Sequence, residues 1–187
     1  YGDFDADGVT ATALLVQVLR SLGARAKPYI PHRIDEGYGL NLDALQQLKD
    51  DGVRVVITVD CGVRSLDEVA FGTRLGLDMI ISDDHAPTET LPDAFAVIDP
   101  KQPHCKYPTK DLSGVGVAFK LAQALLRVHA RVPLNNQAPV SEDALLDLVA
   151  LGTVADLVPL TNENRALVQR GVARLRASAS PLCPNAL

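Results

Sequence analysis

The sequence of 187 residues has no tryptophan, one methionine and three cysteines, and aromatic residues make up 4% of it. The cysteines Cys61, Cys105 and Cys183 are odd in number, far apart and without a C-x-x-C pair, which argues against a disulfide framework and a zinc–thiolate site. We therefore expect a reducing, cytoplasmic location. No stretch approaches the roughly 18 apolar residues of a membrane span, and no signal peptide leads the sequence, so a membrane location is not expected.

An excess of positive charge is also absent. The net charge of −5 argues against general attraction to nucleic acid, so a nucleic-acid substrate would have to be held by local contacts. A hydrophobic content of 47% is enough for one core, and we expect a single domain over residues 1–187. Since Tyr1-Gly2 is too short to be the strand before "DFDADG", we expect a fragment whose first strand is largely missing.

Apolar periodicity and turn residues predict alternating helices and strands. The helical segments are 9–23, 41–52, 65–76, 113–131, 141–156 and 162–176, and the buried strands are 53–60, 77–84 and 94–99. Asn41, Ser141 and Asn162 are the expected N-caps. This alternation predicts an α/β fold with a mostly parallel sheet, flanked by helices on both faces and followed by a helical C-terminal part.

Aspartates gather where hydrophobic runs end. The run ends read "DFDADG", "TVDCG" and "ISDDHAP", which contain Asp3, Asp5, Asp7, Asp60, Asp83, Asp84 and His85. Because the carboxyl ends of parallel strands meet at one edge of a sheet, we expect these side chains to lie close together. In an extended stretch, alternate residues such as those of "DFDAD" also point to the same side.

For any one of Asp7, Asp60 or Asp83 alone, a helix cap or a turn is the favoured explanation. Three similar strand ends favour a metal site, because clustered carboxylates repel one another unless cations neutralise them. Oxygen ligands suit Mg²⁺ and Mn²⁺, and two such ions commonly serve attack on a phosphate ester. Asp156 in "GTVADLVPL" is a further candidate, for which a turn or cap is an equally good explanation.

Six motifs occur in the order "GDFDADG", "PHRIDEGYGL", "TVDCG", "SDDHAP", "SGVGVAF" and "GTVADLVPL". Together they resemble the RecJ branch of the DHH phosphoesterase superfamily over essentially the whole chain. The resemblance implies a DHH phosphoesterase domain whose C-terminal companion domain is absent here. It also implies a 5′-to-3′ exonuclease of single-stranded DNA in repair and recombination, with two Mn²⁺ or Mg²⁺ ions. A single-strand-binding protein is an implied partner, and we expect a monomer.

The resemblance assigns five metal ligands: Asp5, Asp7, Asp60, Asp84 and Asp156. Asp60 would bridge both ions, and Asp3 would act beside Asp5 as a ligand or supporting carboxylate. The Asp-His-His motif of the family reads Asp83-Asp84-His85 here, so Asp84 stands where a ligand histidine is expected. A site made only of oxygen ligands should lean toward harder ions. The added negative charge should disfavour a nearby substrate phosphate.

The expected catalytic residues are His85, Asp60 and Asp3, with Asp83 in support. A protonated His85 could bind the scissile phosphate or protonate the leaving oxygen, and the two ions would activate the attacking water.

In "PHRIDEGYGL", Arg33 can hold a phosphate through two hydrogen bonds, and the resemblance places it at the 5′ end of the strand. An ion pair with Asp35 or Glu36 explains Arg33 equally well without the family. Tyr38 can stack on a base. Gly114, at a helix N-terminus, can offer its N–H to a phosphate, although helix packing also explains a glycine there.

Three other functions compete with the exonuclease. Oligonucleotide and cyclic-dinucleotide phosphodiesterases and family II pyrophosphatases of the superfamily carry a histidine where this chain has Tyr1. A catalytically degenerate scaffold of a replication or repair complex is kept open by Asp84. A dinucleotide-binding module would need a G-x-G-x-x-G turn, which "DFDADGVT" does not provide.

Overall fold

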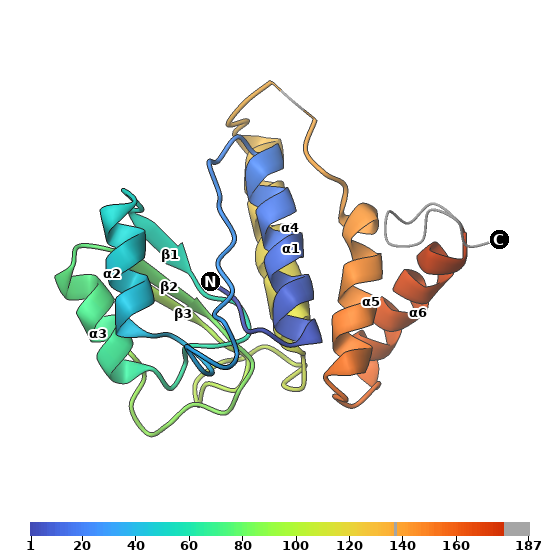
Figure 1. Cartoon of the computed structure of the whole chain (residues 1–187). Coiled ribbons are helices and arrows are strands. Elements are labelled where there is room, and N and C mark those ends of the chain that lie inside the picture. Colours follow the sequence, from blue (N-terminus) through green and yellow to red (C-terminus); the bar gives the residue numbers. More distant parts are fainter. Residues whose placement is uncertain (137, 178–187) are drawn as a thin grey trace.

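The computed structural model describes residues 1–136 and 138–177. Its elements in chain order are α1 (Ala6–Ser21), α2 (Leu42–Asp50), β1 (Val55–Ile57), α3 (Leu66–Arg74), β2 (Asp78–Ser82), β3 (Ala96–Ile98), α4 (Gly114–Arg131), the 3₁₀ helix η1 (Glu142–Leu145), α5 (Leu146–Ala155) and α6 (Asn162–Arg176). The named strands form a parallel sheet in the order β1-β2-β3. Helices α2 and α3 lie on one side of the sheet and α1 and α4 on the other, with α5 and α6 beyond them (Figure 1). The predicted α/β architecture is therefore confirmed.

The sheet lies between two hydrophobic cores, as parallel sheets between helices do. Val56, Met79 and Ile81 face the smaller core under α2 and α3. Ile57, next to Val56, and Ile98, next to Val97 of the smaller core, pack against the larger core formed with α1 and α4. The alternation of neighbouring residues between two cores follows from the two-residue period of a strand.

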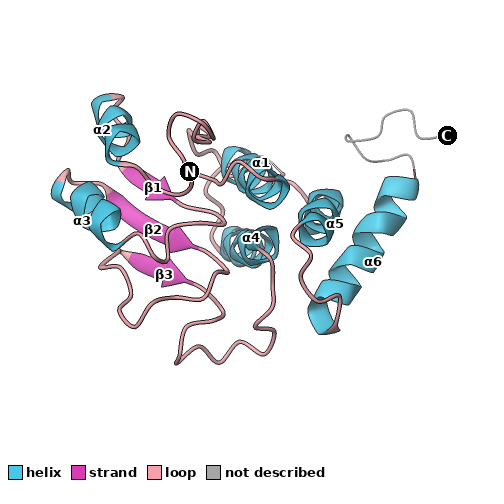
Figure 2. Cartoon of the chain, turned by 60° about the horizontal axis from the view of Figure 1, so that its bottom comes forward, coloured by secondary structure: helices cyan, strands magenta, loops and turns pink. Residues whose placement is uncertain are grey.

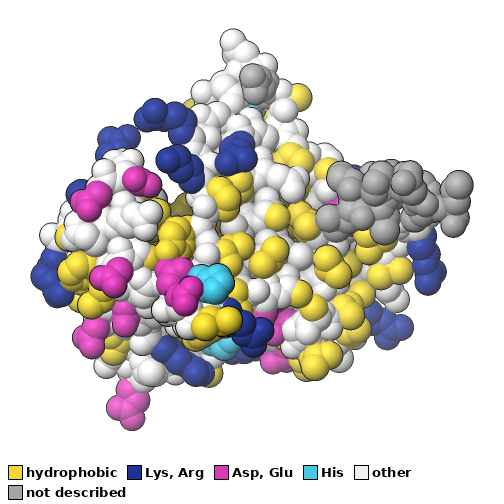
Figure 3. Space-filling view, in the orientation of Figure 1, with side chains coloured by type: hydrophobic (Ala, Val, Ile, Leu, Met, Phe, Trp, Pro, Cys, Tyr) yellow, Lys and Arg dark blue, Asp and Glu magenta, His cyan; other side chains and the backbone are white. Residues whose placement is uncertain are grey.

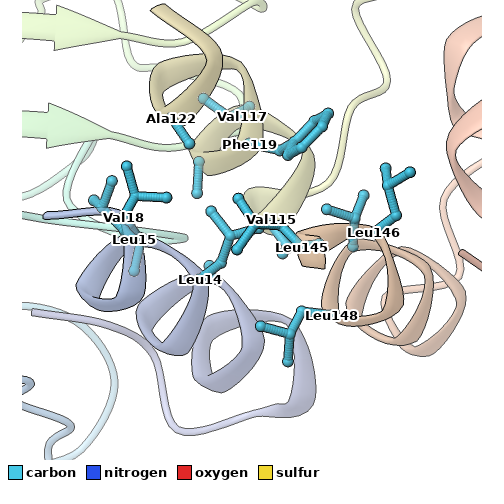
Figure 4. Close-up of a cluster of buried hydrophobic side chains, with 14 of the residues drawn as sticks. Leu14, Leu15, Val18, Val115, Val117, Phe119, Ala122, Leu145, Leu146 and Leu148 are labelled. Atoms are coloured by element: carbon cyan, nitrogen blue, oxygen red, sulfur yellow. The ribbon is translucent and has the colours of Figure 1, made fainter. Parts of the chain in front are cut away.

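The larger core joins the sheet to the C-terminal helices. Figure 4 shows side chains of α1, α4 and α5 meeting at its centre, among them Leu14, Leu15, Val18, Val115, Val117, Phe119, Leu146 and Leu148. Helix α5 is apolar on nearly every side, and hydrophobic side chains also lie across the outer face of this region (Figure 3). A Cβ on Gly171 of α6 would lie 2.1 Å from the Leu146 carbonyl oxygen, so this glycine lets α6 pack directly on α5.

The first two residues continue the sheet beyond β1. The amino group of Tyr1 donates to the Ile57 carbonyl at 2.9 Å, and the Val59 N–H donates to the Tyr1 carbonyl at 2.9 Å. Gly2 forms a parallel bridge with Val59. This pairing delivers the aspartates that follow to the carboxyl end of the sheet.

Two local predictions are wrong and two are confirmed. Helix α1 begins at Ala6, before the predicted start after Gly8, because the Asp5 side chain accepts hydrogen bonds from the second and third residues of the helix. Asn162 is not an N-cap: it is the first residue of α6, with φ of 44°. The predicted caps Asn41 and Ser141 accept from the Ala44 and Ala144 N–H groups.

None of the helices within residues 1–136 and 138–177 is both long and apolar enough to cross a bilayer. Cys61 is buried and Cys105 is partly buried, and both are free thiols. Cys183 lies outside the described residues.

Candidate metal centre

Carboxylates from four parts of the chain meet at one end of the molecule. The carboxyl ends of the strands, the start of α1, the start of α4 and the end of α5 all lie at this end, which comes forward in Figure 2. Ligand atoms of Asp60, Asp83, Asp84 and His85 lie within 4.8 Å of one another, as do those of Asp3, Asp5 and Asp60. Asp60 thus belongs to both groups.

Asp60 is held in an unusual backbone conformation. Its φ is 61°, a left-handed value that non-glycine residues adopt rarely and that concentrates at functional sites. Helix α4 begins directly against it, since a Cβ on Gly114 would lie 2.5 Å from the Asp60 Cβ. Burial, with repulsion from Asp7 and Asp84, raises the pKa of Asp60. A cation would relieve this repulsion.

Asp7 is anchored on the N-terminus of α4. Its Oδ2 accepts from the Gly114 N–H at 2.6 Å and its Oδ1 from the Val115 N–H at 2.9 Å. Burial raises the pKa of Asp7 to about 7, although these two hydrogen bonds favour the charged form. Each oxygen keeps a lone pair for a cation. The Gly114 N–H, which the sequence suggested for a substrate phosphate, donates to Asp7.

Asp5 is both the cap of a helix and one of the potential metal ligands. Its Oδ1 caps α1, accepting from the Asp7 and Gly8 N–H groups at 2.9 and 3.0 Å. The same side chain also lies within ligand distance of Asp3 and Asp60. The cap fixes the direction of the carboxylate and leaves its second oxygen available.

Two buried oxygens test whether a cation fits the site. Asp3 Oδ1 and Asp84 Oδ1 have no hydrogen-bond partner within the described part of the chain. A buried carboxylate oxygen without a donor is costly, and a cation would compensate for it. The surrounding donors are almost all carboxylates, which are the ligands of Mg²⁺ and Mn²⁺. The residues therefore fit a divalent cation.

Asp83 holds the loop after β2 together. Its Oδ2 accepts from the Val63 N–H at 2.8 Å, and its Oδ1 accepts from the Asp84 N–H at 2.8 Å. Oδ1 also lies 2.8 Å from His85 Nδ1, and this hydrogen bond raises the pKa of His85. Because Nδ1 is engaged by Asp83, the other ring nitrogen, Nε2, is the one that can contact a substrate. These contacts orient the His85 ring, and the supporting role of Asp83 stays a prediction.

Asp156 reaches the cluster from the C-terminal end of α5, where it is the C-cap residue. Burial, with repulsion from Asp84 and Asp5, raises its pKa to about 6. The carboxylate is therefore near enough to feel the charges of Asp84 and Asp5, although its ligand atom is in neither of the two groups described above.

Arg33 and Tyr38 lie at the rim. The Arg33 guanidinium is 4.8 Å from the centre of the Phe4 ring, and Tyr38 Oη is 3.5 Å from His85 Nδ1. The alternative partners of Arg33 are engaged elsewhere: Asp35 pairs with His32, and Glu36 accepts from Tyr29 and Asn41. A cavity of about 230 Å³ opens beside Tyr38 and His85, and its other lining residues are Gly62, Arg64, Ser65 and Asp83.

The sequence analysis missed Asp99 and Lys101. Asp99 is buried at the end of β3, its Oδ1 accepts from the Lys101 N–H at 2.6 Å, and burial raises its pKa to about 6. Lys101 Nζ lies 3.5 Å from Asp84 Oδ2. The signal was present, since "AFAVID" ends in an aspartate like the other hydrophobic runs.

Comparison with known proteins identifies similar chains. The model of the DHH family, N-terminal domain, matches residues 1–153. Over 94% of its length, the chain is 49% identical to the single-stranded-DNA-specific exonuclease RecJ of Bacillus subtilis and 46% identical to that of Escherichia coli. It spans 21% and 31% of these two relatives.

Solved structures agree with this similarity. A crystal structure of exonuclease RecJ bound to manganese matches 95% of the chain with a TM-score of 0.80 and 40% identity, and the chain covers 43% of it. RecJ from Thermus thermophilus in complex with Mn²⁺ matches 96% of the chain with a TM-score of 0.74 and 36% identity, and 24% of that chain is covered.

Proposed function

The chain belongs to the DHH family, and we propose that it carries the cation-binding site of a single-stranded-DNA-specific exonuclease that hydrolyses phosphodiesters from the 5′ end. The observation that carries the proposal is the position of Asp60, which is shared by two groups of potential metal ligands. The relatives named as exonucleases of this kind support the choice of substrate.

In this proposal, Asp60 is a ligand of both cations. Asp3 and Asp5 complete one site, and Asp7, Asp84 and Asp156 complete the other. When bound, the two ions would activate water and neutralise charge on the phosphoryl oxygens. Structures of RecJ bound to manganese and in complex with Mg²⁺ support either metal.

The remaining residues would position the strand and move protons. His85, oriented by Asp83, would present Nε2 to the scissile phosphate or to the leaving oxygen. Arg33 would contact the 5′ phosphate and Tyr38 would stack on a base, since Tyr38 lies beside His85 and Arg33 lies over Phe4, next to Asp3 and Asp5 in the sequence. A single-strand-binding protein as partner, a monomeric state and a cytoplasmic location stay predictions.

The test is cleavage of a labelled, 5′-phosphorylated single-stranded oligonucleotide by the full-length protein with Mn²⁺ or Mg²⁺. We expect shortening from the 5′ end, and a loss of at least about 10³-fold in rate in Asp60→Ala. Asp93→Ala is the matched control, because Asp93 is an exposed carboxylate in the loop between β2 and β3.

Three results would change the proposal. Cleavage in Asp84→His but not in the native protein would identify a degenerate site and favour the scaffold. Cleavage that persists in Asp60→Ala would show that the reaction does not depend on this metal centre. Metal binding without any cleavage would point to a small phosphoester as the substrate.

A further inference from the structure

An ammonium group lies on one side of the carboxylate cluster. Lys101 Nζ is 3.5 Å from Asp84 Oδ2, and the Lys101 backbone N–H is fixed by Asp99 Oδ1 at 2.6 Å. The positive charge also favours the ionised forms of Asp99 and Asp156, although burial raises the pKa of both. The positive charge of Lys101 therefore favours the ionised carboxylates on the side of the cluster that contains Asp84 and Asp156.

The opposite side, formed by Asp3, Asp5 and Asp60, has different neighbours. Asp3 is influenced by the charges of His85 and Arg33. The Arg33 guanidinium is held over the Phe4 ring, and His85 Nδ1 is held by Asp83. The main positive charges that act on Asp3 are thus those of His85 and Arg33, whereas Lys101 contacts Asp84, so the two sides of the cluster have different cationic neighbours.

The Lys101 contact satisfies Asp84 only in part. A separation of 3.5 Å is at the outer limit of a hydrogen bond, and Asp84 Oδ1 has no hydrogen-bond partner within the described residues. The Asp84 side chain is 7% exposed, so water compensates little for the missing contact. The Lys101 side chain is 30% exposed and has a flexible stem, so its ammonium can move toward solvent.

We propose that the Lys101 ammonium neutralises the Asp84 and Asp156 side when no cation is bound there, and lowers the affinity of that side for a divalent cation. The inference rests on the proposed two-cation site. A cation entering beside Asp84 must displace the ammonium or bind against its repulsion, whereas a cation beside Asp3 and Asp5 need not. The two ions should therefore bind in order, the weaker one on the Lys101 side.

The experiment is a Mn²⁺ titration of the full-length protein, followed by calorimetry and by the electron paramagnetic resonance signal of free Mn²⁺. The variants are Lys101→Met, Lys101→Arg and the matched control Lys106→Met, which removes an exposed lysine from the same loop. We expect two unequal sites in the native protein. Lys101→Met should tighten the weaker site by about tenfold or more, because one nearby positive charge is removed.

The other variants distinguish the effect of the positive charge at position 101 from the effect of side-chain shape. Lys101→Arg should keep the native difference between the two sites, and Lys106→Met should match the native protein. Two bound ions with affinities in Lys101→Met within about twofold of native would overturn this inference and leave the proposed function intact. If no Mn²⁺ binds to any of the four proteins, the metal centre itself is wrong, and the inference is wrong with it.

Discussion

Asp60 combines three features that a structural aspartate would not need together: a left-handed backbone, burial and close neighbours of the same charge. Burial and repulsion from Asp7 and Asp84 make its charged form unfavourable in the metal-free protein. Asparagine has nearly the same shape, tolerates positive φ and can donate to the neighbouring carboxylates. Activity and stability should therefore respond to Asp60→Asn in opposite directions.

We expect Asp60→Asn to increase the free energy of unfolding in EDTA by about 1–2 kcal/mol, since it removes a buried, repelled charge. The measurement is urea unfolding of the full-length protein, with the slope of the transition checked for constancy. The same variant should bind Mn²⁺ at least about tenfold more weakly, since it loses the ligand common to both groups.

Asp60→Ala is the comparison for this prediction. Alanine removes the charge as well, but it cannot donate to Asp7 or Asp84 and lacks the tolerance of asparagine for the left-handed conformation. It should therefore be less stable than Asp60→Asn. If Asp60→Asn is less stable than the native protein in EDTA, the inference that repulsion between carboxylates at this position destabilises the metal-free protein is wrong.

At the level of elements, the junction of α4 with the end of β1 sets the geometry of the site. A Cβ on Gly114 would lie 2.5 Å from Asp60 Cβ and 2.7 Å from Asp60 Oδ1. Gly116, two residues along the same helix, is less crowded, since its Cβ would lie 3.3 Å from a Leu112 methyl group, which would have to move by a few tenths of an ångström. The two glycines therefore form a matched pair for substitution.

We expect Gly114→Ala to reduce the rate of cleavage about 10²-fold, because Asp60 must shift to admit the methyl group. Gly116→Ala should stay within about threefold of native, because its methyl group requires only a small shift of Leu112 and does not contact Asp60. Circular dichroism would check that both variants fold. Equal loss in both would mean that Gly114 contributes only helix flexibility, and an effect confined to Gly116 would contradict the packing described for α4.

The order of elements could be predicted from the sequence because hydrophobic periodicity and caps are local. The caps Asn41 and Ser141 were found for this reason. The ends of elements were harder to predict: β1 spans three residues of a predicted eight, since a ladder forms only where a partner strand is present. Asn162 failed as a cap because a favourable residue type does not by itself fix the backbone.

The residues of the site could be predicted from the sequence more readily than the contacts between them. Aspartates at strand ends are visible in the sequence, and the α/β topology places them together. The attachment of Asp7 to the first residue of α4 joins positions 107 residues apart and has no local signal. The pairing of Asp84 with Lys101 was missed for a similar reason, because it depends on how the loop after β3 returns to the site.

For the whole molecule, the proposed ligands come from different layers of the fold. Asp3 and Asp5 precede α1 and Asp7 lies in its first turn, Asp60 and Asp84 follow β1 and β2, and Asp156 follows α5. A cation bound between Asp60 and Asp156 would join the C-terminal helices to the sheet. Helices α2 and α3 lie on the opposite face of the sheet and contribute none of these ligands (Figure 2).

We therefore expect Mn²⁺ to stabilise the full-length protein by about 2.7 kcal/mol when its free concentration is about 100 times the dissociation constant. Hydrogen exchange should locate this effect. Protection should increase at the ends of β1 and β2, at the start of α1 and in α5, and change little in α2 and α3. Asp60→Asn is the control that should lose the effect. Protection confined to the start of α1 would remove Asp156 from the site, because a cation that does not bind Asp156 cannot hold α5 to the sheet.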